Sequence, residues 1–110
     1  MNLVYGKGGI KVIIKFKNIN FSLGTRKLGE SIRNTISQNI IAEEIIVFDF
    51  ADVDLISNSF ADECFGKLIE DFGIDYVKSK TTFRNVNPLI DMVIKKAITD
   101  RIKKNLLCQV

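Results

Sequence analysis

Short apolar runs alternate with amphipathic stretches along the 110 residues of this chain. The first two runs, Asn2–Tyr5 and Ile10–Phe16, contain β-branched and aromatic residues and predict two strands. The segment Gly6–Gly9 between them predicts a turn, because glycine adopts positive φ at little cost. It lacks the GxxxxGKS/T pattern of a phosphate-binding loop, and no helix follows it. These residues therefore predict an N-terminal hairpin.

The next amphipathic stretch predicts the first helix, over residues 26–40. Thr25 is a favourable N-cap residue, and a loop over Lys17–Gly24 precedes it. Apolar positions then recur every four residues, at Leu28, Ile32, Ile36 and Ile40. We expect the polar side chains of this helix to face water: Arg26, Lys27, Glu30, Arg33 and Gln38.

The strongest strand pattern is Glu44–Phe50. Its apolar run Ile45–Phe48 indicates burial on both faces, as in the middle of a sheet flanked by helices. An acidic turn, Ala51–Ile56, leads out of it, and three N-cap residue types follow: Ser57, Asn58 and Ser59. Ser59 and Asp62, three residues apart, are similar to a capping box.

The helix predicted after these residues ends at Gly73, a residue type suited to a helix C-terminus. Its buried stripe consists of Phe60, Cys64, Phe65, Leu68, Ile69 and Phe72. Four charged residues are predicted on the opposite, exposed side: Asp62, Glu63, Lys67 and Glu70. Gly66 inside the helix is unfavourable by about 1 kcal/mol relative to Ala. Its presence therefore indicates the close approach of a neighbouring element.

The last third of the chain predicts one strand and one helix. The segment Ile74–Lys80 is ambiguous and can be extended, while Thr81–Val86 is the better strand candidate. Asn87 as N-cap and Pro88 at the first helical position predict a helix start. The apolar face of that helix continues for about four turns. Residues 106–110 then predict either a fraying end or a last strand.

The order of predicted elements is β-β-α-β-α-β-α, which indicates one α/β domain over residues 1–110. Strands separated by helices require a mixed sheet with mostly parallel central pairs and right-handed crossovers. About three helices pack on this sheet, and some or all of them can share one face. One Pro, seven Gly and the lack of a low-complexity segment leave no linker that would divide the chain.

Charge is distributed unevenly, although the net charge is only +3. Residues 43–75 contain ten acidic side chains and one basic one, which gives −9, whereas the remainder contains fifteen basic and three acidic, which gives +12. We therefore expect an acidic region around the central strand, turn and helix, and basic regions elsewhere. Such asymmetry steers partners or neighbouring subunits, and the alternative is that the charges are only solvated.

Several classes of function are excluded or disfavoured. The chain has no His and two Cys, Cys64 and Cys108, so Ser-His and Cys-His nucleophile pairs and an ordinary zinc site are excluded. Both thiols are expected to be free. No run of about 18 apolar residues is available to span a membrane, and the N-terminus lacks a signal-peptide pattern. We therefore expect a cytoplasmic protein without membrane contact or cofactor, in which the commonest catalytic routes are closed.

The phrase IIVFDFADVDLISNSFADECFGKLI resembles the STAS domain (sulfate transporter and anti-sigma factor antagonist), as do Thr25-Arg26 before it and FRNVNP after it. The closer resemblance is to the bacterial STAS-like domain family of unknown function, and it extends over roughly residues 10–104. It implies a protein-interaction module rather than an enzyme.

In anti-sigma factor antagonists, the loop after the central strand carries an Asp-Ser-Ser-Gly motif. A partner kinase phosphorylates the first Ser, which ends binding to that partner. The resemblance places the four positions on Ser57, Asn58, Ser59 and Phe60, and only Ser59 agrees. Asn58 cannot accept a phosphate from a Ser/Thr kinase, so Ser57 and Ser59 are the candidate phosphorylation sites. Their alternative role is to cap the helix.

Docking of a protein partner is the favoured hypothesis for function. The resemblance implies a GHKL-type ATPase or kinase, or an anti-sigma-like regulator, as that partner. The candidate contact residues are Asp52, Asp54, Ser57, Asn58, Ser59, Asp62 and Glu63.

Three alternatives remain open. The last helix could bind nucleic-acid phosphates through Lys95, Lys96, Arg101, Lys103 and Lys104. Asp100 interrupts this set and no aromatic residue lies within it, which disfavours nucleic acid as a partner. An enzyme could hold Mg²⁺ on Asp49, Asp52, Asp54, Asp62 and Glu63, but no second catalytic group accompanies them. A homodimer could form between the acidic and basic regions or by exchange of the apolar tail.

Overall fold

The computed structural model describes residues 2–6, 9–18, 25–42 and 45–108. Its strands are β1 (Asn2–Gly6), β2 (Gly9–Lys15), β3 (Ile45–Asp49) and β4 (Thr81–Arg84). Its helices are α1 (Arg26–Ile41), α2 (Asn58–Ala61), α3 (Lys67–Phe72), α4 (Ile74–Lys80) and α5 (Pro88–Cys108). Two short elements complete it, a 3-10 turn η1 (Phe16–Asn18) and a π-helical turn η2 (Asp62–Gly66) that joins α2 to α3.

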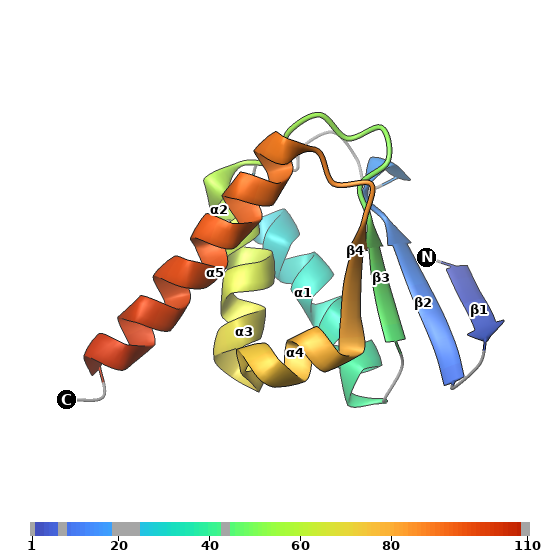
Figure 1. The fold of residues 1–110 in the computed structure, drawn as a ribbon, viewed down its shortest axis with the longest axis horizontal. Coiled ribbons are helices and arrows are strands. Elements are labelled where there is room, and N and C mark those ends of the chain that lie inside the picture. Colours follow the sequence, from blue (N-terminus) through green and yellow to red (C-terminus); the bar gives the residue numbers. More distant parts are fainter. Residues whose placement is uncertain (1, 7–8, 19–24, 43–44, 109–110) are drawn as a thin grey trace.

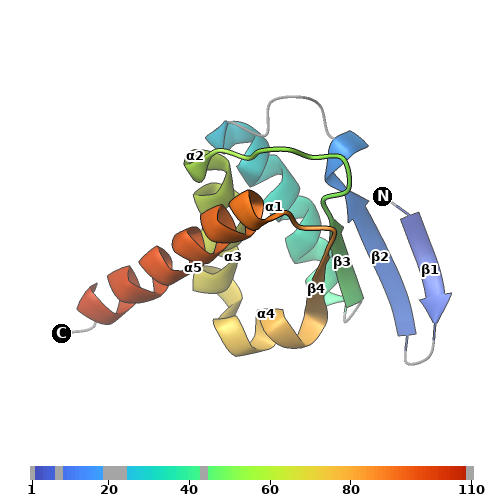
Figure 2. The ribbon, with the colours of Figure 1, turned by 45° about the horizontal axis from the view of Figure 1, so that its top comes forward.

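The four strands form one sheet in the order β1-β2-β3-β4. β1 pairs antiparallel with β2, and β2, β3 and β4 pair parallel. The predicted mixed, mostly parallel sheet is therefore confirmed. Successive parallel strands advance in one direction across the sheet, so right-handed crossovers place their connecting helices on the same face. Figures 1 and 2 both show the helices gathered on one side of the strands.

Alternate residues of β2 and β3 point into the core beneath the helices. Val12, Ile14, Ile46 and Phe48 belong to the hydrophobic core. The predicted burial of β3 is confirmed for Ile46, Val47 and Phe48, whereas Ile45 is half-buried and the helices flank only one face of the sheet (Figures 1 and 2). Aromatic rings fill the space between sheet and helices, and Phe16 stacks on Phe50 with ring centroids 4.3 Å apart.

α1 begins at the predicted cap, where Thr25 Oγ1 accepts a hydrogen bond of 3.2 Å from the amide of Leu28. Three residues of its predicted stripe, Ile32, Ile36 and Ile40, are buried, whereas Leu28 is half-buried. The prediction that Arg33 faces water is wrong, because only 15% of its side chain is exposed and it binds Glu63. The partner comes from a different helix, so the periodicity of α1 alone does not reveal it.

The second helical segment differs from the prediction at its start. Ser57 is the N-cap, and its Oγ accepts a 3.0 Å hydrogen bond from the amide of Phe60. The predicted capping box of Ser59 and Asp62 is therefore wrong, since Ser59 already lies within the first turn.

The register of the same segment then changes at the π turn η2, which accommodates one extra residue and turns the following side chains. Glu63 is consequently 5% exposed and Asp62 is half-buried. The prediction that both face water is wrong. Phe72, predicted as a buried residue, is only half-buried.

The ambiguous segment is helix α4, and the extended alternative is wrong. Gly73 ends α3 with a φ of 84° and accepts a hydrogen bond from the amide of Val77, which begins the new helix. Tyr76 stacks on Phe72 and donates from its hydroxyl to the carbonyl of Ile40. These tertiary contacts favour a helix where the local pattern was ambiguous.

α5 begins as predicted, with Asn87 Oδ1 accepting a 2.8 Å hydrogen bond from the amide of Ile90. It continues to Cys108, so neither a frayed end nor a strand is found at 106–108. The predictions for residues 7–8, 19–24, 44 and 109–110 lie outside the described residues. Within the described part of the chain, no helix combines the length and the apolarity needed to cross a bilayer.

Candidate functional site

The loop between β3 and α2, residues 50–57, exposes Asp52, Asp54 and Leu55 and is held by hydrogen bonds. The amide of Val53 donates to the carbonyl of Phe50 at 3.1 Å, and Asp52 at the turn has a φ of 62°. Asn87 Nδ2 donates to the carbonyls of Val53 (3.2 Å) and Asp54 (3.0 Å). Asn87, the residue before α5, therefore fixes the position of this loop.

At the base of the loop, Asp49 has a structural role. It is 7% exposed and accepts hydrogen bonds from Asn85 Nδ2 (2.9 Å), the Ala51 amide (3.0 Å) and Arg84 Nη2 (3.2 Å). These bonds, that from Asn85 above all, hold the pKa of Asp49 below its ordinary value. The carboxylate thus anchors the segment after β4 to the end of β3.

The seven residues predicted to contact a partner fall into two groups. Asp52, Asp54 and Asn58 are exposed, and Ser57 and Ser59 are half-buried along the same loop and first helical turn. Asp52 lies 3.5 Å from Lys17 Nζ, an exposed pair of little energetic weight. Asp62 and Glu63 instead lie between helices.

Asp62 joins α1 to α5. Arg101 binds its carboxylate in a bidentate manner, with Nε–Oδ1 and Nη2–Oδ2 distances of 2.7 and 2.8 Å. Arg26 Nη1 donates to Oδ2 at 2.8 Å. The hydrogen bonds from Arg101, followed by those from Arg26, hold the pKa of Asp62 well below its ordinary value despite partial burial. Arg101 also donates to Glu70 Oε2 at 3.0 Å.

Glu63 joins η2 to α1 and α3. Arg33 Nη1 donates to Glu63 Oε2 (2.8 Å) and to the Glu63 carbonyl (2.7 Å), and Lys67 Nζ lies 2.9 Å from Oε2. Burial acts to raise the pKa of Glu63, but the hydrogen bonds from Lys67 and Arg33 outweigh it and lower the pKa. The carboxylate is therefore ionised and fully engaged inside the protein.

We call this set the interhelical ion network; its members are Arg26, Arg33, Asp62, Glu63, Lys67, Glu70 and Arg101. Sequence reasoning missed its basic members, since it placed Arg33 in water and Arg101 on a basic face. The available signals were two adjacent acids next to the apolar stripe of a helix and a glycine one turn later. Neither signal specifies which arginines pair with the acids.

Two glycines allow these helices to approach closely. A Cβ at Gly29 would lie 2.9 Å from the carbonyl oxygen of Phe60. A Cβ at Gly66 would lie 2.8 Å from Cγ of Arg101 and 2.9 Å from Oδ1 of Asp62. The close approach predicted at Gly66 is confirmed, and the approaching element is α5.

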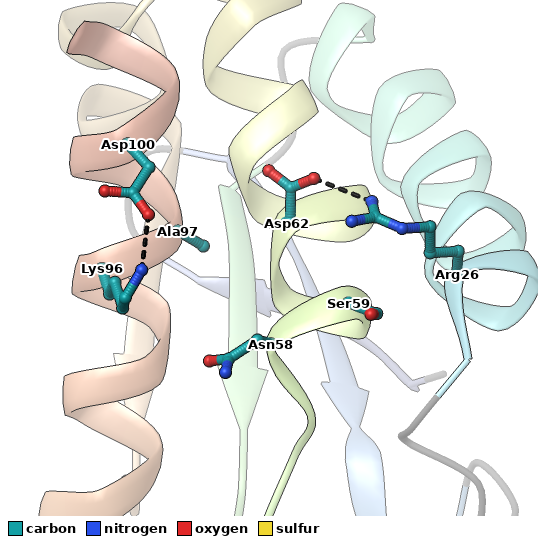
Figure 3. Close-up of a pocket in the computed structure, with 7 residues that line it drawn as sticks. All are labelled: Arg26, Asn58, Ser59, Asp62, Lys96, Ala97 and Asp100. Atoms are coloured by element: carbon teal, nitrogen blue, oxygen red, sulfur yellow. Dashed lines mark hydrogen bonds and ion pairs between the residues drawn. The ribbon is translucent and has the colours of Figure 1, made fainter. Parts of the chain in front are cut away.

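A polar cavity of about 300 Å³ opens beside the start of α2. Figure 3 shows Arg26 of α1 on one side, Lys96 and Asp100 of α5 on the other, and Asn58 and Ser59 between them. Lys96 Nζ and Asp100 Oδ2 are paired at 2.7 Å. The cavity combines both signs of charge with hydrogen-bonding groups, so it can accept a polar side chain of a partner.

The five basic residues predicted to contact phosphates have different surroundings in the structure. Lys95 and Lys96 pair with acids of their own helix, Asp91 (2.9 Å) and Asp100 (2.7 Å). Arg101 is committed to the interhelical ion network. Lys103 and Lys104 are exposed.

The carboxylates proposed for Mg²⁺ are also dispersed. In residues 2–6, 9–18, 25–42 and 45–108, no group of three or more His, Cys, Asp or Glu is placed to hold a metal ion. Cys64 is a buried free thiol whose pKa is raised by burial. The Cys108 side chain lies outside the described residues.

A mixed, mostly parallel sheet covered by helices on one face, with a loop leading from β3 into α2, defines a small α/β fold. A family model described as the STAS-like domain of unknown function (DUF4325) matches residues 29–91. The match extends from α1 into the first turn of α5, more than half of the chain, and the chain belongs to this family. No curated protein and no solved structure matches.

Proposed function

We propose that this protein is a non-catalytic, cytoplasmic regulatory module that binds a protein partner through the loop between β3 and α2 and the first turn of α2. Membership of the STAS-like family supports a regulatory or protein-interaction role. The proposal rests mainly on the exposure of Leu55, whose side chain is 60% exposed between Asp54 and the buried Ile56. An exposed leucine on a loop fixed by hydrogen bonds is already ordered for binding, so little entropy is lost when a partner covers it.

The surroundings of Leu55 define the chemistry of the partner. Asp52 and Asp54 flank it as exposed carboxylates, so the partner presents basic side chains around an apolar pocket. Asn58 and Ser59 line the adjacent polar cavity and supply hydrogen bonds. In this proposal Asp62 forms the floor of the cavity, and Glu63 positions α2 without touching the partner.

A GHKL-type ATPase or kinase, or an anti-sigma-like regulator, is the partner class that we propose. If the partner is a kinase, Ser59 is the better acceptor of the two serines. Ser57 uses its Oγ to cap the helix, whereas Ser59 lines the cavity. Arg26 and Lys96, paired with Asp62 and Asp100, line the same cavity and would have to exchange these partners for a phosphate.

Site-specific photo-crosslinking in cells of the source organism tests the proposal. A photoreactive amino acid at position 55 should give one discrete crosslinked protein, which then binds the purified wild-type chain. The matched control is position 79 in α4, at the opposite end of the molecule from the loop (Figure 1). Equal crosslinking of that same protein from both positions, or none from position 55, would contradict the proposal.

A further inference from the structure

The C-terminal half of α5 extends beyond the other helices. Figures 1 and 2 both show it projecting from the body of the domain. Arg101 is the last residue of α5 whose side chain is tied to another helix by ion pairs. Residues 102–108 continue for about 10 Å at the helical rise of 1.5 Å per residue. A helix that continues past its last tertiary anchor exposes any apolar side chain on it.

An apolar stripe follows this projecting segment. Ile98, Ile102 and Leu106 are spaced four residues apart and lie on one face of α5. Ile98 and Ile102 are half-buried against the core, and Leu106 is 63% exposed. The stripe therefore begins inside the domain and ends in solvent.

The inner end of the stripe borders an apolar groove of about 190 Å³. The groove lies between α3, α4, β4 and α5, and apart from Lys78 and Thr81 its lining is apolar. Its apolar lining includes Phe65, Val77, Phe83 and Ile98. Phe83, on the edge strand β4, is 40% exposed at the opening. An exposed phenylalanine beside an apolar groove marks a surface that a partner covers.

The stripe is symmetric about Ile102, because Ile98 and Leu106 each lie about 6 Å from it along the helix. Two copies of α5 packed antiparallel would place Leu106 of each copy beside Ile98 of the other. Leu106 would then enter the groove next to Phe83. One surface would thus serve both copies, as a two-fold interface requires.

Charge also favours a second copy as the occupant. Lys103 lies on the exposed side of the projecting segment, and no acidic residue follows Asp100 in the sequence. The corner between α3 and α4, beside the groove, exposes Asp71 and Asp75. A basic arm and an acidic corner on the same molecule are complementary between two copies. We propose that this chain forms a two-fold dimer in which the end of α5 of each copy occupies the groove of the other.

This proposal is independent of the loop at residues 50–57. Sedimentation equilibrium of the full chain over about a hundredfold range of concentration should show a reversible monomer–dimer equilibrium. Leu106→Glu should weaken the dimer at least about tenfold, because it would bury an unpaired charge. Met92→Glu is the matched control, a similarly exposed apolar residue of α5 about 21 Å before Leu106 along the helix, and it should leave the dimer unchanged.

A disulfide trap tests the symmetry directly. In a Cys108→Ser background, Ile102→Cys should form a disulfide-linked dimer with oxidised glutathione, since residue 102 of both copies meets at the axis. Lys104→Cys points to the other side of the helix, about 200° away, and should remain unlinked. A chain that is monomeric throughout the range, or a dimer that Leu106→Glu leaves intact, would overturn the proposal.

Discussion

Two pairs of acidic residues lie within twelve positions of each other and have different structural roles. Asp52 and Asp54 are exposed on a loop, whereas Asp62 and Glu63 lie between helices in ion pairs with arginines of α1 and α5. The sequence shows all four as one acidic region. The two pairs differ in their surroundings: Asp52 forms only an exposed ion pair with Lys17, at 3.5 Å, whereas the charges of Asp62 and Glu63 are balanced by basic side chains within the fold.

The largest expected effect is on stability, from removal of Glu63. Glu63→Ala would leave the guanidinium of Arg33 largely buried without its carboxylate, because 15% of the Arg33 side chain is exposed. We expect a loss of about 3 kcal/mol in the free energy of unfolding, measured by urea denaturation. Asp54→Ala is the control, and it should change stability by less than about 0.5 kcal/mol. Equal losses in the free energy of unfolding would contradict the claim that Glu63 supports the fold and Asp54 does not.

The next effect concerns the close approach of α5 to η2. Gly66→Ala improves helix propensity by about 1 kcal/mol. The new Cβ would nevertheless lie 2.8 Å from Cγ of Arg101 and 2.9 Å from Oδ1 of Asp62. We expect the clash to outweigh the propensity and to destabilise the protein by about 1 kcal/mol, seen as a lower melting temperature. A more stable variant would show that α5 is free to shift away.

A smaller effect concerns pH. The pKa of Asp62 is lower in the folded state than its unfolded value, so its stabilising contribution is fully present above about pH 4 and is lost as the pH falls further. Asp62→Asn should therefore lower stability at pH 7 and reduce the loss of stability between pH 5 and pH 3, measured by denaturation at each pH. Asp54→Asn, outside the network, should keep the steep acid dependence of the wild type. An identical acid profile for Asp62→Asn and wild type would contradict the role given to Asp62.

The smallest effect on stability is expected from substitutions in the loop between β3 and α2. Asp52→Lys combined with Asp54→Lys removes only one exposed ion pair, to Lys17 at 3.5 Å. We expect the free energy of unfolding to change by less than about 0.5 kcal/mol. A large loss measured by the same denaturation would show that these carboxylates also support the fold.

Periodicity along the chain was sufficient to predict most of the fold. The local pattern predicts three of the four stripe residues of α1, the buried strand β3 and the Asn87-Pro88 start of α5, and the structure confirms them. α4 was ambiguous because Gly73 and the contacts of Tyr76 with α1 and α3 decide its conformation. The π turn could not be predicted, since a one-residue insertion in helical register depends on packing against α1 and α5.

The candidate site was only partly predictable for the same reason. The exposure of Asp52, Asp54 and Asn58 follows from an acidic turn between a strand and a helix cap. The burial of Glu63 depends on Arg33, thirty residues earlier, and the engagement of Asp62 depends on Arg101, thirty-nine residues later. Pairings at that separation are set by the tertiary fold and leave no local pattern.

The most direct test of the central claim is the yield of crosslinked partner from position 55 in the Asp52→Lys, Asp54→Lys variant. If the exposed pair forms the docking surface, the partner seen with the wild-type loop should be lost while the variant remains folded. An undiminished yield from a folded variant would contradict the account, because the partner would then bind without the charges that distinguish the loop from the interhelical ion network.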